Sequence, residues 1–484
     1  MGIFDKKSKK NEEEEEVVVA AKTPEEMKRE KAAKTTSFVM GIEKILPTQA
    51  FAEVIVMGKM DGSAIADTEV RLCNPGSDND TPEAIKILGI QTEVGEVRTT
   101  SGGSVALRVS VVPGREYRVG DVIYTEDATL ESKVHSYVKA LTNTYVADKD
   151  LALSKEEVEK LSITDVEEIW RFYGWFIREI DKEDSDEKKA EHMTKISMIG
   201  NTLCNKLMNA DSIYCVFSSL TGEPYMFSRT VRSDDGSYMC TAPNVRIFTE
   251  SYKERMQEIF KDEKYVIRKI ENGENKQGIF NFFGTVFYLN GAAGVEIISE
   301  DTTVTAASLV REPDYSDVPK NSIPVTNPTL VRWMLLMGQL KDEDMKKEEG
   351  RLIYTLYYNF FAREAMKAKF LVPIRSNKEL PGASEEGRVT LAAGTVLALP
   401  VVDGPNGRQA IRLFTDWRHL YGEFGDKGGA AVETLDSLIS TFDCAINLGE
   451  YPRSGRYVSL ASFNEMEELV QKTVAQKTDT SSQE

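Results

Sequence analysis

A short strand-to-helix signature occurs twice in this chain and sets its organisation. Residues 246–251 read Arg-Ile-Phe-Thr-Glu-Ser, and residues 412–417 read Arg-Leu-Phe-Thr-Asp-Trp. Each copy follows an apolar strand-like run, at residues 213–217 and 370–374, and each run follows helix-like sequence. This arrangement predicts two versions of one α+β domain.

A different pattern precedes the first copy. From about residue 47 to 130 the sequence alternates short apolar runs with glycine turns such as Asp61-Gly62 and Gly102-Gly103. Short strands at this spacing, with no helix between them, are typical of a small closed barrel. The expected fold class is therefore multidomain, with an N-terminal all-β barrel followed by two related α+β domains.

The order of pieces in the barrel resembles the second, β-barrel domain of translational GTPases such as elongation factor Tu. The pieces are residues 68–72 (Thr-Glu-Val-Arg-Leu), 87–91 (Ile-Leu-Gly-Ile-Gln) and 119–123 (Val-Gly-Asp-Val-Ile). The family's GTPase domain is missing, since the chain has no G-x-x-x-x-G-K-[ST] phosphate loop. The resemblance implies docking on RNA or on the ribosome, but acidic side chains outnumber basic ones between residues 47 and 130. A barrel that docks proteins or acts as a spacer fits this charge better.

The remaining boundaries follow from composition. Charged blocks at residues 6–10 and 12–16 indicate a solvated tail, and residues 23–45 could be helical, beginning at Thr23-Pro24. Ser154 could cap a short helix in the connection. The expected parts are a charged tail at 1–45, the barrel at 47–130, a helical connection at 131–161, a diverged first α+β repeat at 162–305, a linker at 306–326, the second repeat at 327–472 and a polar tail at 473–484.

Within the first repeat we expect a helix with a capping box at residues 164–167 (Thr-Asp-Val-Glu). Its apolar residues recur at helical spacing from Val166 to Ile180, which predicts a buried stripe. A last buried strand is expected from Phe282 to Asn290. The second repeat should begin at Asn327-Pro328, a cap followed by proline in the first helical turn.

The second repeat resembles the N-terminal domain of the bacterial SseB family. Four pieces carry the resemblance: an aromatic helix at residues 352–361, the Val372-Pro373 step, the Leu-Phe-Thr corner at residues 413–415, and a late strand with Asn447. The family's usual Thr-Ser at the corner is Thr-Asp here, and its Asn-Pro is Asn-Leu. The first repeat is more diverged, and its membership is inferred from internal similarity. The resemblance implies no catalytic residue and no cofactor.

Six repeat-signature positions are the candidate site residues, and a structural role is the preferred interpretation of each. The two phenylalanines would plug the core, the two threonines would cap helices, and the two asparagines would support turns at strand ends. The alternative is a polar contact to a partner. The six are Phe248, Thr249, Asn290, Phe414, Thr415 and Asn447.

Composition restricts the function further. The net charge of −18, from 60 basic and 78 acidic residues, argues against general nucleic-acid binding. The five cysteines form no C-x-x-C pair and the three histidines lie far apart, so we expect reduced thiols and no local metal site. No apolar run approaches the ~20 residues of a membrane-spanning helix. We therefore expect a cytoplasmic protein without membrane contact.

No catalytic motif in the sequence lies in the structural context that its chemistry requires. The nearest is the segment Gly102 to Ala106, a partial match to G-x-S-x-G, which falls between two strands instead of between strand and helix. The preferred hypothesis is a non-catalytic cytoplasmic interaction or regulatory protein that binds other proteins or a small metabolite through its tandem α+β domains. The alternative is a ribosome- or translation-associated factor that acts through the barrel without GTPase activity.

Overall fold

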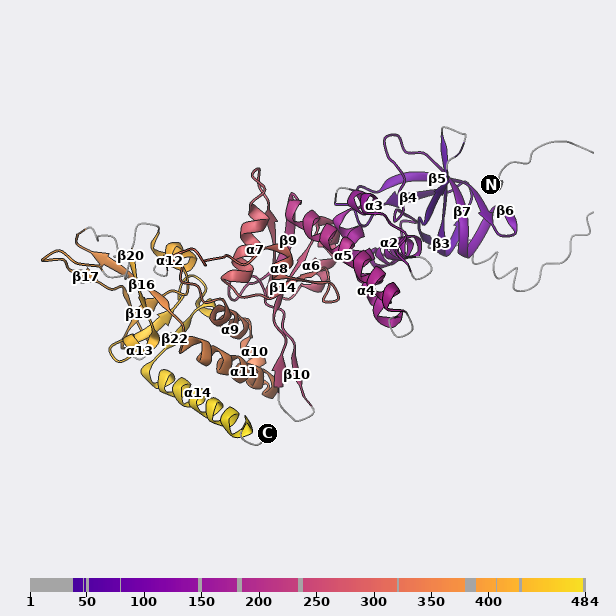
Figure 1. Cartoon of the computed structure of the whole chain (residues 1–484). Helices are drawn as coiled ribbons and strands as arrows, with labels where there is room; N and C mark the ends of the chain where they lie inside the picture. The colour runs from indigo at the N-terminus through magenta and orange to yellow at the C-terminus, as the bar shows by residue number, and fades with distance from the viewer. Residues whose placement is uncertain are drawn as a thin grey trace, which may run out of the picture. The chain divides into compact units, whose positions relative to one another are not determined.

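A computed structural model of the chain shows an N-terminal β-barrel followed by mixed α/β regions (Figure 1). The described chain divides into two compact units, one formed by residues up to Asn74 with Thr81–Ala140, the other by Pro75–Asp80 with Leu141–Glu484. The expected multidomain fold class is confirmed. The structure describes residues 38–46, 48, 52–78, 80, 81–146, 150–180, 185–233, 238–319, 322–378, 389–405, 407–425 and 429–481.

The first unit contains a six-stranded ring that closes on itself. Its strands follow one another in the order β1-β8-β4-β5-β7-β3, and β3 pairs again with β1. Two short strands, β2 (Lys44–Leu46) and β6 (Gly95–Val97), add to β3 and β5. The ring strands are β1 (Phe38–Gly41), β3 (Glu53–Ile65), β4 (Glu69–Cys73), β5 (Glu83–Thr92), β7 (Thr99–Ser110) and β8 (Val122–Tyr124).

The barrel interior is filled by side chains at alternate strand positions. Along β5, Ile85 and Ile87 are buried while Lys86 is exposed, as expected when one face of a strand packs on a core. Close approach of β1 and β3 requires glycine, because a Cβ on Gly58 would lie 2.0 Å from the carbonyl oxygen of Gly41. The ring thus closes where two strands can touch backbone to backbone.

The barrel begins earlier than the sequence indicates. The tail expected to reach residue 45, with helix from residue 23 to 45, is wrong for its last part, since β1 and β2 are strands. Residues 1–37 lie outside the described residues. Helix-favouring composition ends near residue 34, and the run Phe38-Val39-Met40 then supplies the buried face of β1.

Two helices follow the barrel strands along the chain. They are α2 (Leu130–Tyr145) and α3 (Lys155–Lys160). The expected cap at Ser154 is confirmed: its hydroxyl accepts from the backbone N–H of Glu157, and the Glu157 carboxylate accepts from the N–H of Ser154.

The first α/β region is built on a five-stranded sheet with the order β13-β9-β12-β14-β15. Only β12 and β14 run parallel; the other neighbours are antiparallel. A β10–β11 hairpin (Thr230–Arg232 and Tyr238–Cys240) projects from it. The sheet strands are β9 (Ser212–Ser218), β12 (Asn244–Phe248), β13 (Tyr265–Glu271), β14 (Gly294–Ile297) and β15 (Thr303–Thr305).

Helices alternate with these strands. The long helices α4 and α5 precede the sheet, η1 and α6 follow β12, α7 follows β13 and α8 follows β15. One of them begins inside the linker expected at residues 306–326. The bounds are α4 (Ile163–Ile180), α5 (Asp186–Asn209), η1 (Glu250–Tyr252), α6 (Lys253–Ile259), α7 (Gly278–Tyr288) and α8 (Ala306–Leu309).

The second α/β region repeats this strand order. Its strands run β20-β16, then β19-β21-β22, and the bridge between Leu371 and Phe414 joins β16 to β19. Again one pair, β19 with β21, is parallel. Short strands β17 (Leu397–Ala398) and β18 (Val401–Asp403) pair with β16 and β19. The main strands are β16 (Phe370–Ser376), β19 (Gln409–Leu413), β20 (Gly429–Glu433), β21 (Asp443–Ile446) and β22 (Arg456–Val458).

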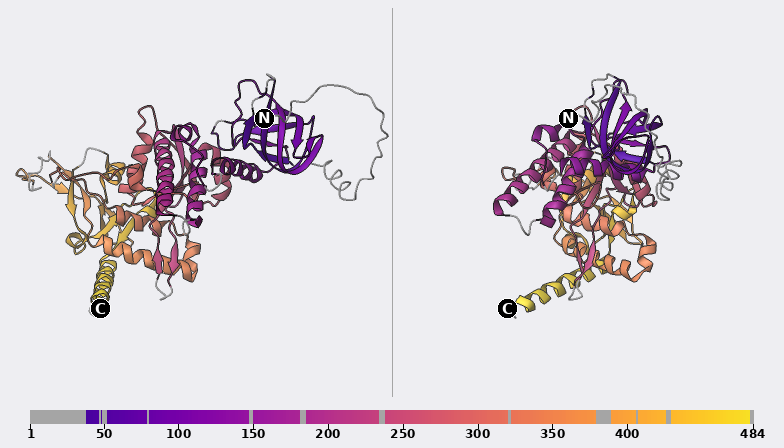
Figure 2. Two further views of the ribbon diagram at one scale, coloured as in Figure 1. Left: turned by 45° about the vertical axis from the view of Figure 1, so that its right-hand side comes forward. Right: turned by 90° about the vertical axis from the view of Figure 1, so that its right-hand side faces the viewer.

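The helices of this region also match in order. Helices α9, α10 and α11 precede the sheet, α12 follows β19, and α13 and η2 flank β21. Helix α14 extends away from the sheet (Figure 2) and reaches Ser481, so it includes most of the segment expected as a polar tail from residue 473. The bounds are α9 (Pro328–Gly338), α10 (Asp342–Lys346), α11 (Glu348–Ala365), α12 (Trp417–Phe424), α13 (Leu435–Leu438), η2 (Pro452–Ser454) and α14 (Leu460–Ser481).

The strand expected from Phe282 to Asn290 is wrong, because this segment lies mostly in helix α7. The buried residues of α7 are Ile279, Phe283, Val286 and Phe287, which recur every three or four positions along one helical face. A continuous apolar run of this length does not separate a buried helix from a buried strand by itself, and its aromatic content favours the strand interpretation.

Candidate functional site

The repeat-signature corners lie where the parallel strands end. Strand β12 ends at Phe248 and β19 ends just before Phe414, so Thr249 and Thr415 start the connections to the following helices. In α/β sheets, ligands bind in the crevice outside the carboxyl ends of parallel strands. A ligand-binding site is therefore expected at one of the two corners.

Both corner phenylalanines are buried in the core. Phe248 stacks on Tyr214 of β9, with ring centroids 5.7 Å apart. The backbone of Phe414 exchanges two hydrogen bonds with Leu371 of β16, of 2.8 and 2.9 Å. Phe248 through its ring and Phe414 through its backbone thus each hold the end of a strand against its neighbour.

Asn447 holds the second corner together. It follows β21 with a φ of 48°, a left-handed conformation that asparagine tolerates better than most residues. Its Oδ1 accepts from the backbone N–H of Thr415 at 3.0 Å, and its Nδ2 donates to the Thr415 hydroxyl at 2.7 Å. One buried side chain therefore ties the end of β21 to the corner after β19.

The cap of helix α12 is Asp416, not Thr415 as expected. The Asp416 carboxylate accepts from the backbone N–H of His419 at 3.0 Å, and the Thr415 hydroxyl instead donates to this carboxylate at 2.7 Å. The ring Nδ1 of His419 also lies 2.7 Å from the carboxylate. A hydrogen-bonded chain thus runs from Asn447 through Thr415 and Asp416 to His419.

Burial alone would raise the pKa of the Asp416 carboxyl. The hydrogen bonds and the charge of His419 outweigh burial, so the pKa lies below its usual value. Because Nδ1 of His419 is engaged by the carboxylate, Nε2 is the ring nitrogen left to contact a bound molecule. The arrangement can donate or accept a hydrogen bond at a fixed point.

A cavity of about 370 Å³ opens beside this chain. Its size is within the ~300–1,000 Å³ range of small-molecule sites. Phe414, His419 and Asn447 line it from the second α/β region, while Thr221 and Glu223 line it from the loop after β9. The cavity therefore combines residues of both α/β regions.

Glu223 is the main polar link across this cavity. Its carboxylate accepts from Arg418 of α12 at 2.9 Å and from Nδ2 of Asn290 at 2.8 Å. The adjacent Gly222 has a φ of 70°, and a Cβ there would lie 2.5 Å from the ring of Tyr451. This loop is therefore closely fitted to the second region.

Asn290 is not the counterpart of Asn447. It follows helix α7, and the strand β14 begins four residues later. The structural counterpart of Asn447 is Ile298, which also follows the second parallel strand with positive φ (62°). Its backbone N–H donates to Ile247 O at 2.8 Å, as that of Asn447 donates to Leu413 O at 2.9 Å. The expectation that Asn290 supports a turn at a strand end, as Asn447 does, is therefore wrong.

The first corner is closed by helix α4. The hydroxyl of Thr249 makes hydrogen bonds with Thr164 (2.9 Å) and Ser251 (2.8 Å) and none that caps a helix, so its expected capping role is wrong. The expected capping box at residues 164–167 is also wrong: Ser162 and Asp165 cap α4 reciprocally, which leaves Thr164 to bond the corner.

Two carboxylates of α4 are buried at this corner. Glu167 accepts from the Thr302 hydroxyl at 2.6 Å, and Glu168 accepts from the Tyr252 hydroxyl at 2.5 Å and pairs with Arg171. Burial, then the neighbouring Glu168 charge, raise the pKa of Glu167 well above its usual value. Sequence reasoning missed this pair, although two glutamates inside an apolar helical stripe were a visible signal.

Other candidate chemistry is sparse within the described part of the chain. There, no three His, Cys, Asp or Glu residues gather as a metal site would require. Burial raises the pKa of the Cys444 thiol to about 12 and that of the Cys215 thiol further, which disfavours reactive thiolates. No described helix is long and apolar enough to cross a membrane.

The fold and the corner define an α+β domain with one parallel strand pair and an aromatic strand-to-helix corner. Residues 357–442, from within α11 to the residue before β21, match the family described as SseB protein N-terminal domain. The expected SseB resemblance of this region is thereby confirmed. Comparison with curated proteins gave no match.

Solved structures of translation factors also match parts of the chain. The apo form of elongation factor SelB from Methanococcus maripaludis and its complex with GppNHp are each 18% identical, cover 19% of this chain and 19% of their own, and give a TM-score of 0.17. GDP-bound aIF5B from Aeropyrum pernix is 10% identical over 44% of this chain and 52% of its own, with a TM-score of 0.18. The chain thus spans about a fifth of the SelB structures. Similarity this low carries no functional argument, and ribosome association stays a prediction.

Proposed function

We propose that this protein is a non-catalytic cytoplasmic binding protein with two SseB-like α+β domains. The second domain, together with the loop after β9, holds a small polar metabolite in the cavity at the carboxyl ends of β19 and β21. The observation that carries this proposal is that the signature residues Phe414 and Asn447 line that cavity beside residues of the first domain.

Three shared features support a tandem pair of domains. Both sheets have the same strand order and a single parallel pair. In both, a residue with positive φ follows the second parallel strand. In both, the start of the first helix bonds the corner threonine: Thr164 bonds the hydroxyl of Thr249, and Asn327 donates to the carbonyl oxygen of Thr415 at 2.8 Å.

The two corners differ in a way that favours the second as the binding site. In the first, the carboxylates of Glu167 and Glu168 are buried and accept hydrogen bonds from Thr302 and Tyr252. In the second, the first turn of α9 places apolar Leu330 and Val331 in the core, and the cavity opens on the other side of the corner, around His419. The second corner thus places fixed polar groups beside open space.

The lining suits a polar ligand of limited size. Arg418, His419 and Glu223 offer charged or ionisable groups, and Ser454 offers a hydroxyl, while the Tyr451 ring supplies apolar contact. The His419–Asp416 pair is explained as a reinforced helix cap that orients the imidazole. Binding, not bond breaking, is the function that this arrangement supports best.

The test uses a cavity-filling variant of the full-length protein. Gly422 lies on α12 and lines the cavity, and a Cβ there would meet no atom within 4 Å. Gly422→Trp should fill the cavity, and Gly422→Ala is the matched control for helix propensity. A panel of polar metabolites from a cytoplasmic extract is screened by thermal shift and native mass spectrometry.

The expected result is that one metabolite raises the Tm of the wild type and of Gly422→Ala but not of Gly422→Trp. A metabolite that binds all three proteins equally would place the site elsewhere. If the screened extract yields no ligand for the wild type, the metabolite-binding function is rejected.

A further inference from the structure

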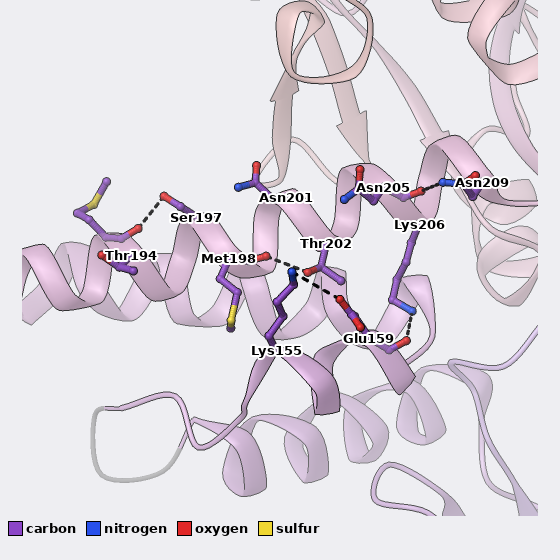
Figure 3. Close-up of a pocket in the computed structure, with 11 residues that line it drawn as sticks. Lys155, Glu159, Thr194, Ser197, Met198, Asn201, Thr202, Asn205, Lys206 and Asn209 are labelled. Atoms are coloured by element: carbon purple, nitrogen blue, oxygen red, sulfur yellow. Dashed lines mark hydrogen bonds and ion pairs between the residues drawn. The ribbon is translucent and has the colours of Figure 1, made fainter.

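A broad groove lies between helices α3 and α5 and shares no lining residue with the cavity beside His419. Its volume is about 890 Å³, and α5 contributes most of its lining (Figure 3). Four uncharged polar residues of α5 line it at intervals of four positions: Ser197, Asn201, Asn205 and Asn209. We call the three asparagines among them the amide row. All four are exposed.

The amide row does not serve the core of the protein. The residues with which α5 packs inward include Ile199, Leu203 and Leu207, which are almost fully buried. An exposed helical surface normally carries lysine, glutamate or arginine, which are better helix formers than asparagine. Three asparagines in register thus weaken the helix and need another reason.

Two of the amides lack side-chain partners. Within the described contacts, the side chains of Asn201 and Asn205 make no hydrogen bond to protein, and Figure 3 shows them on the same side of α5. The Asn209 amide donates to the carbonyl oxygen of Asn205 at 2.8 Å. Each unengaged amide offers a donor and an acceptor, the same pair that a peptide bond requires.

The spacing of the row matches an extended peptide. Residues four apart on a helix are separated by about 6 Å along its axis, and alternate residues of an extended chain by about 6.6 Å. Rows of this kind are inclined by ~26° to the helix axis, so a peptide that follows them crosses α5 obliquely. Successive amides can then meet every second residue of the peptide main chain.

The net positive charge of the groove favours an acidic peptide. Its charged residues are Lys155, Glu159 and Lys206, a net charge of +1 (two lysines minus one glutamate) on a chain of net charge −18. Lys206 is used internally, since its ammonium donates to the carbonyl oxygens of Glu159 and Leu161 at the end of α3. Lys155 is exposed and, among the described residues, pairs only with Glu159 at 3.8 Å, a weak surface pair.

We propose that the amide row binds the main chain of an extended, acidic peptide segment of a partner protein. Asn201 and Asn205 bond alternate peptide units, and Lys155 pairs with an acidic side chain. The exposed Met193 at one end of the groove contacts an apolar side chain of the peptide. This site is separate from the metabolite cavity and does not depend on it.

The test begins with a displayed library of random nonapeptides panned against the full-length protein. Selected peptides should carry aspartate or glutamate at one position and vary at the others. Fluorescence polarisation with a selected peptide should show at least tenfold weaker binding to Asn201→Ala/Asn205→Ala. The matched control is Asn281→Ala/Asn464→Ala, which removes two exposed helical asparagines from α7 and α14.

Backbone methylation separates main-chain from side-chain recognition. Two peptides are compared, one N-methylated at the odd-numbered peptide units and one at the even-numbered units. Methylation of one set should weaken binding about tenfold, and methylation of the other set should weaken it little. Equal binding by the Asn201→Ala/Asn205→Ala and control variants, or recovery of no peptide, would overturn the proposal. So would binding of a single-stranded oligonucleotide that the asparagine substitutions abolish. Alanine favours helix, so loss of folding is not expected in either variant.

Discussion

The side-chain amide of Asn447 hydrogen-bonds both the backbone N–H and the hydroxyl of Thr415, 32 residues earlier in the chain. The contact is buried and joins the end of one parallel strand to the corner that follows the other. Both residues are therefore explained by the contact that they make with each other. Asn447 also lines the cavity, so the corner that this contact stabilises also shapes the cavity.

Asn447→Ala should destabilise the protein by about 3 kcal/mol. Each lost hydrogen bond contributes ~1 kcal/mol, and an alanine in the left-handed region costs ~1–2 kcal/mol. Asn447→Gly keeps the backbone conformation and loses only the bonds, so it should cost about 2 kcal/mol. Urea denaturation measures both. Equal losses for the two variants would show that the backbone conformation is unimportant.

Asp416 should contribute stability that depends on pH. Its folded pKa is lower than the value of ~3.9 expected in the unfolded chain. The carboxylate therefore stabilises the fold above about pH 4, and this contribution is lost as pH falls through the lowered folded pKa. Asp416→Asn should be less stable than the wild type at pH 7, with the difference shrinking in acid. A difference that is constant between pH 7 and pH 3 would contradict the charged cap.

Glu167 should show the opposite pH dependence. Its folded pKa is raised by burial and by Glu168, so between ~4.3, the unfolded value, and the folded value the native state holds the extra proton. Stability therefore falls as pH rises through that window. The glutamine of Glu167→Gln is neutral and can keep the hydrogen bond from Thr302. The variant should therefore be more stable than the wild type, and the difference should be largest at high pH.

Chemical denaturation of Glu167→Gln from pH 4.5 to pH 9 checks this expectation. The control is Glu168→Gln, which removes the charged partner of Arg171 and should be destabilising at neutral pH. If the free energies of unfolding of Glu167→Gln and the wild type differ by the same amount at every pH in this range, Glu167 ionises normally.

Gly222→Ala should loosen the fit of the β9 loop against the second domain. The new Cβ would lie 2.5 Å from the Tyr451 ring, and the φ of 70° disfavours alanine. We expect a loss of about 2–3 kcal/mol, from strain and overpacking together. In a Tyr451→Ala background, Gly222→Ala should no longer cause a steric clash. The loss of stability that remains should then come only from the strained backbone conformation. Thermal and urea unfolding distinguish the two parts, and additive losses would exclude the contact.

Local patterns in the sequence determined a good deal of this protein. Alternating apolar residues with glycine turns predicted the barrel, because a strand with one buried face imposes a period of two on any chain. Proline after Asn327, the cap at Ser154 and the helical stripe from Val166 to Ile180 marked helices for equally local reasons. The Leu-Phe-Thr corner and Asn447 carried the SseB resemblance without any structure.

Only the tertiary structure decided the matters that depend on long-range pairing. The segment around Phe283 became helix because its aromatic face could be buried against the sheet, which composition alone does not reveal. Ile298, not Asn290, proved equivalent to Asn447, since strand register places it after β14 although its side chain differs. The burial of Glu167, the cavity beside His419 and the unengaged amides of Asn201 and Asn205 likewise depend on which surfaces meet. A chain encodes periodicity locally, but burial and hydrogen-bond satisfaction are properties of the packed fold.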